Sequence, residues 1–167
     1  NYGFILIGLG KFKEAELLLR KAIELKPDYA EAHLNLGNIL QGLGKFKEAA
    51  ISTHKAIELK PDYAEAYLNL GNILKNLGKL EDAKLSYHKA IELKPDLVDA
   101  HLNLGNILQS LSDYKYAELY TRKAIELKPD YAEAHLNLGN ILKNLGKLED
   151  AKLSYQKAIE LKPDLTS

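Results

Sequence analysis

The stretch NLGNILKNLGKLEDAKLSY occurs twice without a single change, at Asn69–Tyr87 and again at Asn137–Tyr155. Both copies lead into the run KAIELKPD, which occurs five times in the chain. Those runs begin at Lys21, Lys55, Lys89, Lys123 and Lys157. An enzyme needs its nucleophile or its metal ligands once, whereas a repeat architecture needs the same residues many times. The duplicated stretch therefore indicates a repeated structural unit.

The repeat has a fixed period of 34 residues, which is the step from Pro27 to Pro61 and onward to Pro163. One glycine series and two alanine series keep the same step, beginning at Gly3, Ala15 and Ala22. A fixed period in this range is typical of a solenoid. We predict a single array over 1–167 with a partial repeat, four full repeats and a tail. Their bounds are 1–29, 30–63, 64–97, 98–131, 132–165 and 166–167.

The first half of each repeat is predicted to be a helix. After Pro27, Asp28 is an expected N-cap, and Glu31 three residues later completes the spacing of a capping box. The same pairs recur as Asp62/Glu65, Asp96/Asp99 and Asp130/Glu133. Apolar residues then follow at helical spacing, which predicts a buried face. In the first full repeat these residues are Leu36, Ile39, Leu40 and Leu43.

The second half of each repeat is predicted to be a second helix. Gly44 is expected to end the first helix by adopting a positive φ, and Pro61 should follow the end of the second. The inward residues of this second helix are predicted to be Ala49, Ala56, Ile57 and Leu59. On its outer side we expect ion pairs at i,i+4, each worth about 0.2–0.5 kcal/mol. The predicted pairs are His54–Glu58, Arg20–Glu24 and Arg122–Glu126.

Small residues at fixed positions indicate how the helices pack. Gly37 and Ala56, with their counterparts in other repeats, would allow two helix backbones to approach closely. One repeat buries too little apolar surface to offset the entropy of ordering it, so neighbouring repeats must share faces. The predicted fold class is therefore all-α, an α-solenoid of stacked antiparallel helix pairs.

Composition excludes several classes of function and location. Lys plus Arg and Asp plus Glu number 23 each, which removes the positive charge expected for binding nucleic acid or an anionic membrane. The longest apolar run, YGFILIGLG, is too short to span a membrane and lacks the basic start of a signal peptide. There is no cysteine, which is compatible with a reducing compartment. We therefore expect a cytoplasmic protein. The missing initiator methionine suggests a fragment, a processed product or a trimmed chain.

Residues for catalysis or metal binding are not predicted. No histidine pair has helical metal-ligand spacing, and the histidines instead share two repeat positions. These are His33, His101 and His135 at one, and His54 and His88 at the other. Phosphate-binding and nucleophile motifs are also missing from the sequence. We expect no enzymatic activity, no cofactor and no metal.

A polar stripe is the feature most suggestive of function. On the first helix of each repeat, asparagines recur at i,i+3 on a side away from the core leucines. Asparagine is a poor helix former, yet it offers both a donor and an acceptor for the backbone of an extended peptide. Alternatively, these amides aid solubility or bond between repeats. The predicted groove residues are Asn35, Asn38, Asn69, Asn72, Asn103, Asn106, Asn137 and Asn140, bordered by Leu34, Leu68, Leu102, Leu136, Lys75 and Lys143.

The Leu-Gly pair, two alanines, an aromatic position and a terminal proline in each 34-residue unit resemble the tetratricopeptide repeat. This resemblance implies a right-handed superhelix whose first helices line a concave groove. Asn35, Asn69, Asn103 and Asn137 resemble the asparagine ladder of O-linked N-acetylglucosamine transferases. The chain departs from the family at its first aromatic position, which holds His33 or Tyr67 rather than Trp. The lysines and arginines of a carboxylate clamp are also missing from the groove, so we expect no such clamp.

Three functions stay open at this stage. The first is a non-enzymatic module that binds an extended protein or peptide segment. The second is a structural solenoid that stacks through its ends, because Phe4 and Ile7 make the first repeat apolar where later repeats are polar. The chain would then be part of a longer array or a homo-oligomer. The third is the substrate-recognition arm of a larger enzyme, such as a glycosyltransferase. The two nearly identical repeats indicate recent duplication or design.

Overall fold

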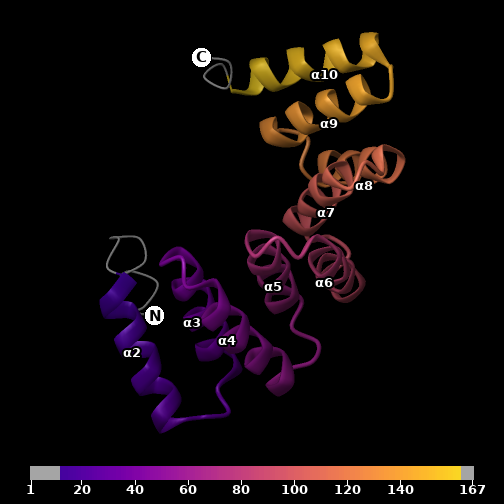
Figure 1. Ribbon diagram of the computed structural model, residues 1–167. Coiled ribbons are helices and arrows are strands. Elements are labelled where there is room, and N and C mark those ends of the chain that lie inside the picture. The colour runs from indigo at the N-terminus through magenta and orange to yellow at the C-terminus, as the bar shows by residue number, and fades with distance from the viewer. Residues whose placement is uncertain (1–11, 163–167) are drawn as a thin grey trace. The chain divides into compact units, whose positions relative to one another are not determined.

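The computed structural model describes residues 12–162 (Figure 1). Within that range the chain forms nine α-helices and no strand. The chain divides into two compact units, residues 1–93 and 94–167. Unit 1 contains α2 (Phe12–Leu25), α3 (Ala30–Gly42), α4 (Phe46–Leu59), α5 (Ala64–Asn76) and α6 (Leu80–Leu93). Unit 2 contains α7 (Val98–Ser110), α8 (Tyr114–Leu127), α9 (Ala132–Asn144) and α10 (Leu148–Leu161).

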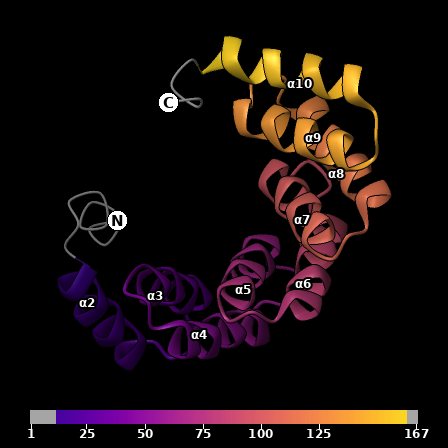
Figure 2. The same ribbon diagram turned by 45° about the horizontal axis from the view of Figure 1, so that its top comes forward.

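Each unit is built from antiparallel helix pairs. The pairs are α3 with α4 and α5 with α6 in unit 1, and α7 with α8 and α9 with α10 in unit 2. A first helix also packs on the second helix before it, as α3 does on α2, α5 on α4 and α9 on α8. In unit 1, α3 and α5 lie on one side and α4 and α6 on the other (Figure 2). The predicted all-α solenoid architecture is confirmed.

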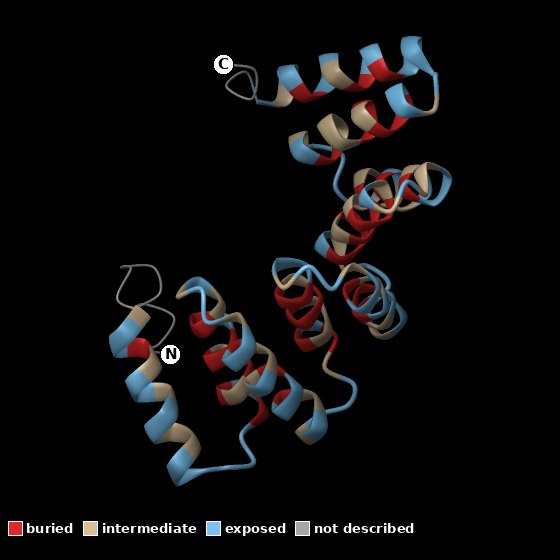
Figure 3. Cartoon of the chain, in the orientation of Figure 1, coloured by how far each residue is buried: buried red, intermediate tan, exposed pale blue. Residues whose placement is uncertain are grey.

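The core lies between these helices and consists of aliphatic side chains around alanines. In unit 1, Leu36, Leu40, Ala49 and Ile73 form one buried cluster that joins α3, α4 and α5. The alanines of the second helices are fully or almost fully buried, and they allow the first helices to lie close. Burial follows one stripe of each helix, while the opposite stripe is exposed (Figure 3). The predicted inward positions of both helices are therefore confirmed for Leu36, Leu40 and Ala49.

The turn inside each pair requires a left-handed residue. Gly44, Gly78 and Gly146 adopt φ of 73°, 73° and 74°, as predicted for Gly44. Their N–H groups bond back to the last turn of the first helix, as Gly44 does to the carbonyl of Gln41 at 2.9 Å. In the α7–α8 turn the same place is taken by Ser112, with φ 62°. An L-residue in this region carries a steric cost that glycine does not.

Replacing Ser112 with glycine is expected to raise the free energy of unfolding by about 1 kcal/mol, because the left-handed strain disappears. Urea denaturation followed by circular dichroism would measure the change. Gly146→Ser is the matched control and should lower stability by a similar amount. A Ser112→Gly protein no more stable than the parent would contradict the argument.

The predicted capping boxes are wrong. The N-caps of α3, α5, α7 and α9 are Tyr29, Tyr63, Leu97 and Tyr131, and none makes a side-chain capping bond. Asp28 lies one residue earlier, in a turn closed by the N–H of Tyr29 on the carbonyl of Lys26 at 3.2 Å. The turn places the aromatic residue at the helix start, where the Lys26 ammonium lies 5.3 Å from the ring centroid of Tyr29. A cation–π contact therefore replaces the carboxylate cap.

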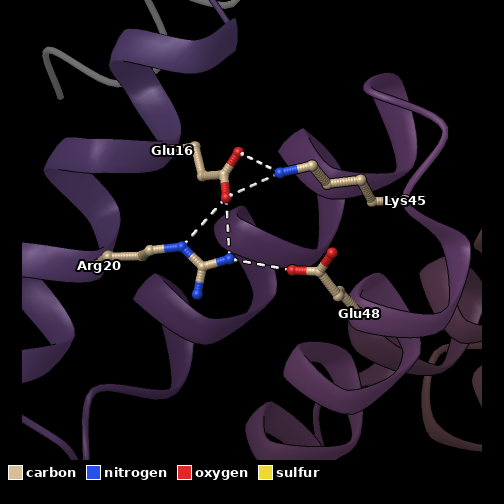
Figure 4. Close-up of polar contacts among 4 residues, drawn as sticks. All are labelled: Glu16, Arg20, Lys45 and Glu48. Atoms are coloured by element: carbon tan, nitrogen blue, oxygen red, sulfur yellow. Dashed lines mark hydrogen bonds and ion pairs between the residues drawn. The ribbon is translucent and has the colours of Figure 1, made fainter.

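The predicted pairs Arg20–Glu24 and Arg122–Glu126 are also wrong, because both arginines turn toward the preceding helical turn. Arg20 donates to Glu16 at 2.8 Å and to Glu48 of α4 at 3.1 Å (Figure 4). Lys45 adds a second bond to Glu16 at 3.0 Å, which links α2 to the turn before α4. Bonds from Arg20 and Lys45 hold the pKa of Glu16 below its usual value. A carboxylate shared by two cations outcompetes an isolated exposed pair.

Two further features of the described helices limit the fold's context. No helix among residues 12–162 is long and apolar enough to cross a membrane. The remaining predicted pair, His54–Glu58, is not a hydrogen bond, since Glu58 accepts from Lys55 at 2.9 Å. The nearby charge of His54 still contributes, after Lys55, to the lowered pKa of Glu58.

Candidate functional site

The predicted groove asparagines all lie on first helices. Asn38 is exposed and Asn69 is buried, with 6% of its surface accessible. The others are partly buried; they are Asn35 on α3, Asn72 on α5, Asn103 and Asn106 on α7, and Asn137 and Asn140 on α9. Since α3 packs against α5 and α7 against α9, each unit carries its own pair of adjacent asparagine-bearing helices.

Two of these amides are oriented by a tyrosine of the same repeat. The phenol of Tyr87 donates to Oδ1 of Asn72, and that of Tyr155 donates to Oδ1 of Asn140, each at 2.9 Å. Tyr87 is fully buried, and burial raises its pKa, so the phenol keeps its proton. Each bond occupies an amide oxygen, which turns the NH₂ of the amide away from the tyrosine.

Another pair of amides bonds between repeats. Asn137 of α9 donates from Nδ2 to Oδ1 of Asn106 on α7 at 2.8 Å. Asn69 occupies the equivalent place on α5, but its buried Nδ2 has no hydrogen-bond partner. Its amide lies instead beside Gly37 of α3, since a methyl group added to that glycine would meet Nδ2 at 3.5 Å. The first asparagine of each pair therefore contributes to packing between neighbouring first helices.

The residues predicted to border the groove differ in exposure. Leu34 and Leu102 are 5% and 2% accessible and pack against alanines of α4 and α5, or of α8 and α9. Little of either side chain is left for a ligand. Leu68 and Leu136 are partly buried, while Lys75 and Lys143 are exposed in the last turns of α5 and α9. Phe4 and Ile7 lie outside the described residues.

The histidines at the first aromatic position have a structural role. Nε2 of His33 donates to the carbonyl of Pro27 at 2.9 Å, and Nε2 of His101 and His135 donates to Pro95 and Pro129 at 2.8 Å. Each bond ties a first helix to the loop before it. Among residues 12–162 there is no cluster of His, Cys, Asp or Glu that could hold a metal.

Models of repeat families match most of the chain. A TPR repeat model matches 3–44 and 71–112, and tetratricopeptide repeat models match 30–63, 98–131, 132–165 and, in a separate model, 55–84. The chain belongs to the tetratricopeptide repeat family. Members of this family generally serve as non-enzymatic scaffolds for protein interactions, and this chain is such a scaffold. No curated protein has a sequence similar enough to count as a relative.

Solved structures of tetratricopeptide proteins are similar over nearly the whole chain. A crystal structure of MamA has 26% sequence identity and a TM-score of 0.87, covering 98% of this chain and 95% of MamA. YrrB, described as a TPR protein with an unusual peptide-binding site, has 25% identity and a TM-score of 0.80, covering 99% and 85%. PilF from Pseudomonas aeruginosa shares the fold, with 24% identity, a TM-score of 0.89, and coverage of 95% and 72%.

Sequence analysis missed the tyrosines that orient Asn72 and Asn140. A signal was available, because Tyr87 and Tyr155 each lie 15 residues after the asparagine that they contact. The other described repeats hold Thr53 or Thr121 at this position, and these side chains cannot reach the amide. The tetratricopeptide array therefore contains two kinds of repeat, with and without an oriented amide.

Proposed function

We propose that the chain is an interaction module that binds an extended peptide segment along its first helices through repeated asparagine amides. The observation that carries this proposal is the orientation of Asn140. Its oxygen accepts from Tyr155, and its nitrogen has no partner in the described part of the chain. A fixed amide with two unused N–H groups suits a carbonyl of a ligand backbone.

Spacing also supports a peptide ligand. Packed helices lie about 8–10 Å apart, and an extended chain advances about 3.3 Å per residue. Each pair of neighbouring first helices therefore corresponds to about three residues of an extended ligand. Odd or even side chains would not keep pace with this step, but backbone carbonyls recur in every residue. Recognition should consequently depend weakly on the sequence of the peptide.

The two kinds of asparagine divide the work. Asn137 and Asn69 lie toward the neighbouring first helix, so they set the distance between helices. Asn38 is exposed, and Asn140 is oriented by Tyr155, so these two are the ones proposed to contact the ligand. YrrB supports the proposal, because its described peptide-binding site occurs on a similar fold. Lys75 and Lys143 would border the bound segment and favour an acidic residue near it.

Binding to an array of unstructured peptides, followed by fluorescence anisotropy on the best binders, tests the proposal. The double variant Asn38→Ala/Asn140→Ala removes one ligand amide from each unit. Affinity should fall by about 10- to 100-fold, because each hydrogen bond contributes about 1 kcal/mol. Gln156→Ala, an exposed amide on α10, is the matched control and should bind like the parent.

A second measurement addresses the polarity of the contact. A ligand with backbone esters in place of amides presents weaker carbonyl acceptors, so it should bind the parent less well than the native peptide does. The double variant should lose most of this discrimination. Unchanged affinity in the double variant would contradict the proposed role of the amides, whatever the ester series shows.

A further inference from the structure

The second helices carry an exposed aliphatic side chain in every described repeat. We call this set the outer aliphatic row; it consists of Leu17, Ile51, Leu85, Leu119 and Leu153, which are 56%, 72%, 64%, 58% and 63% accessible. Its members are 34 residues apart. A single exposed leucine is ordinary, but an aliphatic residue at one surface position of five successive helices is a repeated feature of the surface.

The row faces away from the core. Ile51 follows the fully buried Ala49 by two residues, which places it about 200° around α4. The same offset separates Leu153 from the buried Ala151 of α10. Packing within a repeat therefore does not account for these side chains. They also lie on the opposite helices from the asparagines, so the row is independent of the proposed peptide site.

A pocket lies beside the row in each unit. In unit 1, a pocket of about 460 Å³ is formed by α2, α3 and α4, and its apolar lining is Ile23, Leu36 and Ile51. In unit 2, a second pocket of about 460 Å³ is formed by α8, α9 and α10, with Ile125, Leu138 and Leu153 at the equivalent positions. Each unit thus presents protruding aliphatic side chains next to an open apolar pocket.

The rims of these pockets are electrically balanced. Arg20 bonds to Glu16 and Glu48, and Lys55 bonds to Glu58 at 2.9 Å. In unit 2, Arg122 bonds to Glu118 at 2.9 Å, and Lys157 bonds to Glu160 at 3.0 Å. The cations are therefore already neutralised, and the chain as a whole has 23 residues of each sign. Such a rim does not select a strongly charged ligand, and it does not repel a copy of itself.

We propose that the outer aliphatic row and its pockets bind a second copy of this chain. In a contact with two-fold symmetry, the protruding side chains of each copy would enter the pockets of the other. A second copy carries protrusions at the same repeat spacing as the pockets, and its rim charges are equally balanced. The face of the asparagine-bearing helices stays open in such a dimer.

Sedimentation equilibrium from micromolar to millimolar concentration tests the dimer. The parent chain should show a reversible monomer–dimer equilibrium. Replacing Ile51, Leu85, Leu119 and Leu153 with serine should raise the dissociation constant by about 100-fold or more, because most of the apolar contact is lost. Leu25→Ser/Leu148→Ser, which removes two exposed leucines outside the row, should leave it unchanged. Circular dichroism checks that each variant is folded.

Spin labels locate the contact. The chain has no cysteine, so Ser52→Cys beside the pocket and Asn38→Cys on a first helix each give one labelling site. Dipolar coupling between copies should be strong at position 52 and weak at position 38. A strictly monomeric parent would overturn the proposal, even if the row captured another protein. So would an unaffected dimer in the serine variant, or one dissociated only by Phe4→Asn/Ile7→Gln.

Discussion

Replacing Tyr87 with alanine is expected to lower the free energy of unfolding by about 3–5 kcal/mol, the largest effect of any single substitution considered for this chain. Its ring is fully buried and lies directly over Gly71, where a methyl group would overlap the ring atoms. Truncation would leave a cavity between α5 and α6 that small neighbours cannot fill. It would also remove the hydrogen bond that orients Asn72.

Two variants separate these contributions. Tyr87→Phe keeps the ring and loses only the bond to Asn72, so it should cost about 1–2 kcal/mol. Tyr155→Ala is the equivalent truncation in α10, where the ring is only partly buried, and it should cost less than Tyr87→Ala. Urea denaturation followed by circular dichroism measures all three. If Tyr87→Ala were no worse than Tyr87→Phe, the packing of the ring would not be what stabilises this repeat.

The pH dependence of stability gives an independent check on the same phenol. Burial raises the pKa of Tyr87 in the folded protein above the ordinary value of about 10. The unfolded chain therefore releases this proton first, and stability is lost as the pH rises beyond about 10. Below that pH the contribution is fully present. Tyr87→Phe should show a smaller loss between pH 9 and 11 than the parent does.

The helices and their order could be predicted because their signals are local and repeated. Gly44 between two apolar runs can only be a left-handed turn residue, and Ala49 opposite Leu40 can only be an inward position. A 34-residue period then averages out the deviations of single repeats. Ser112 is the one described turn residue that departs from the glycine series, and the array keeps the same backbone there.

Local chemistry was a poorer guide where two partners compete. Asp28 is a good N-cap in isolation, but the turn that follows Pro27 places Tyr29 at the helix start. Arg20 has an acceptor four residues away on each side, and only Glu16 also lies near Lys45 of the next repeat. Both outcomes depend on residues brought together by the fold, which the spacing along one helix does not reveal.

The candidate site shows the same division. The sequence alone predicts asparagines on one side of the first helices, because that depends only on helical spacing. Whether an amide faces a ligand depends on its neighbours: Asn140 is turned by a tyrosine from the paired helix, while Asn137 reaches across to Asn106. The outer aliphatic row was visible as a period in the sequence. Its exposure became clear only when the buried alanines had fixed the orientation of the second helices.

Replacing Gly71 with alanine should lower the free energy of unfolding by about 1–3 kcal/mol, although alanine is the better helix former. The added methyl group would overlap the ring of Tyr87, which cannot move because it is fully buried and hydrogen-bonded. Gly42→Ala is the matched control. There the nearest atom is 3.2 Å away, on the ring of the partly exposed Phe12, so the helix propensity of alanine should make the change neutral or mildly stabilising. Denaturation of the two variants side by side measures the difference, and equal effects at both glycines would show that close approach of the ring does not determine the residue at Gly71. The double variant Gly71→Ala/Tyr87→Ala sharpens the test: with the ring gone, the added methyl group should no longer cost stability, so the two substitutions should be strongly non-additive.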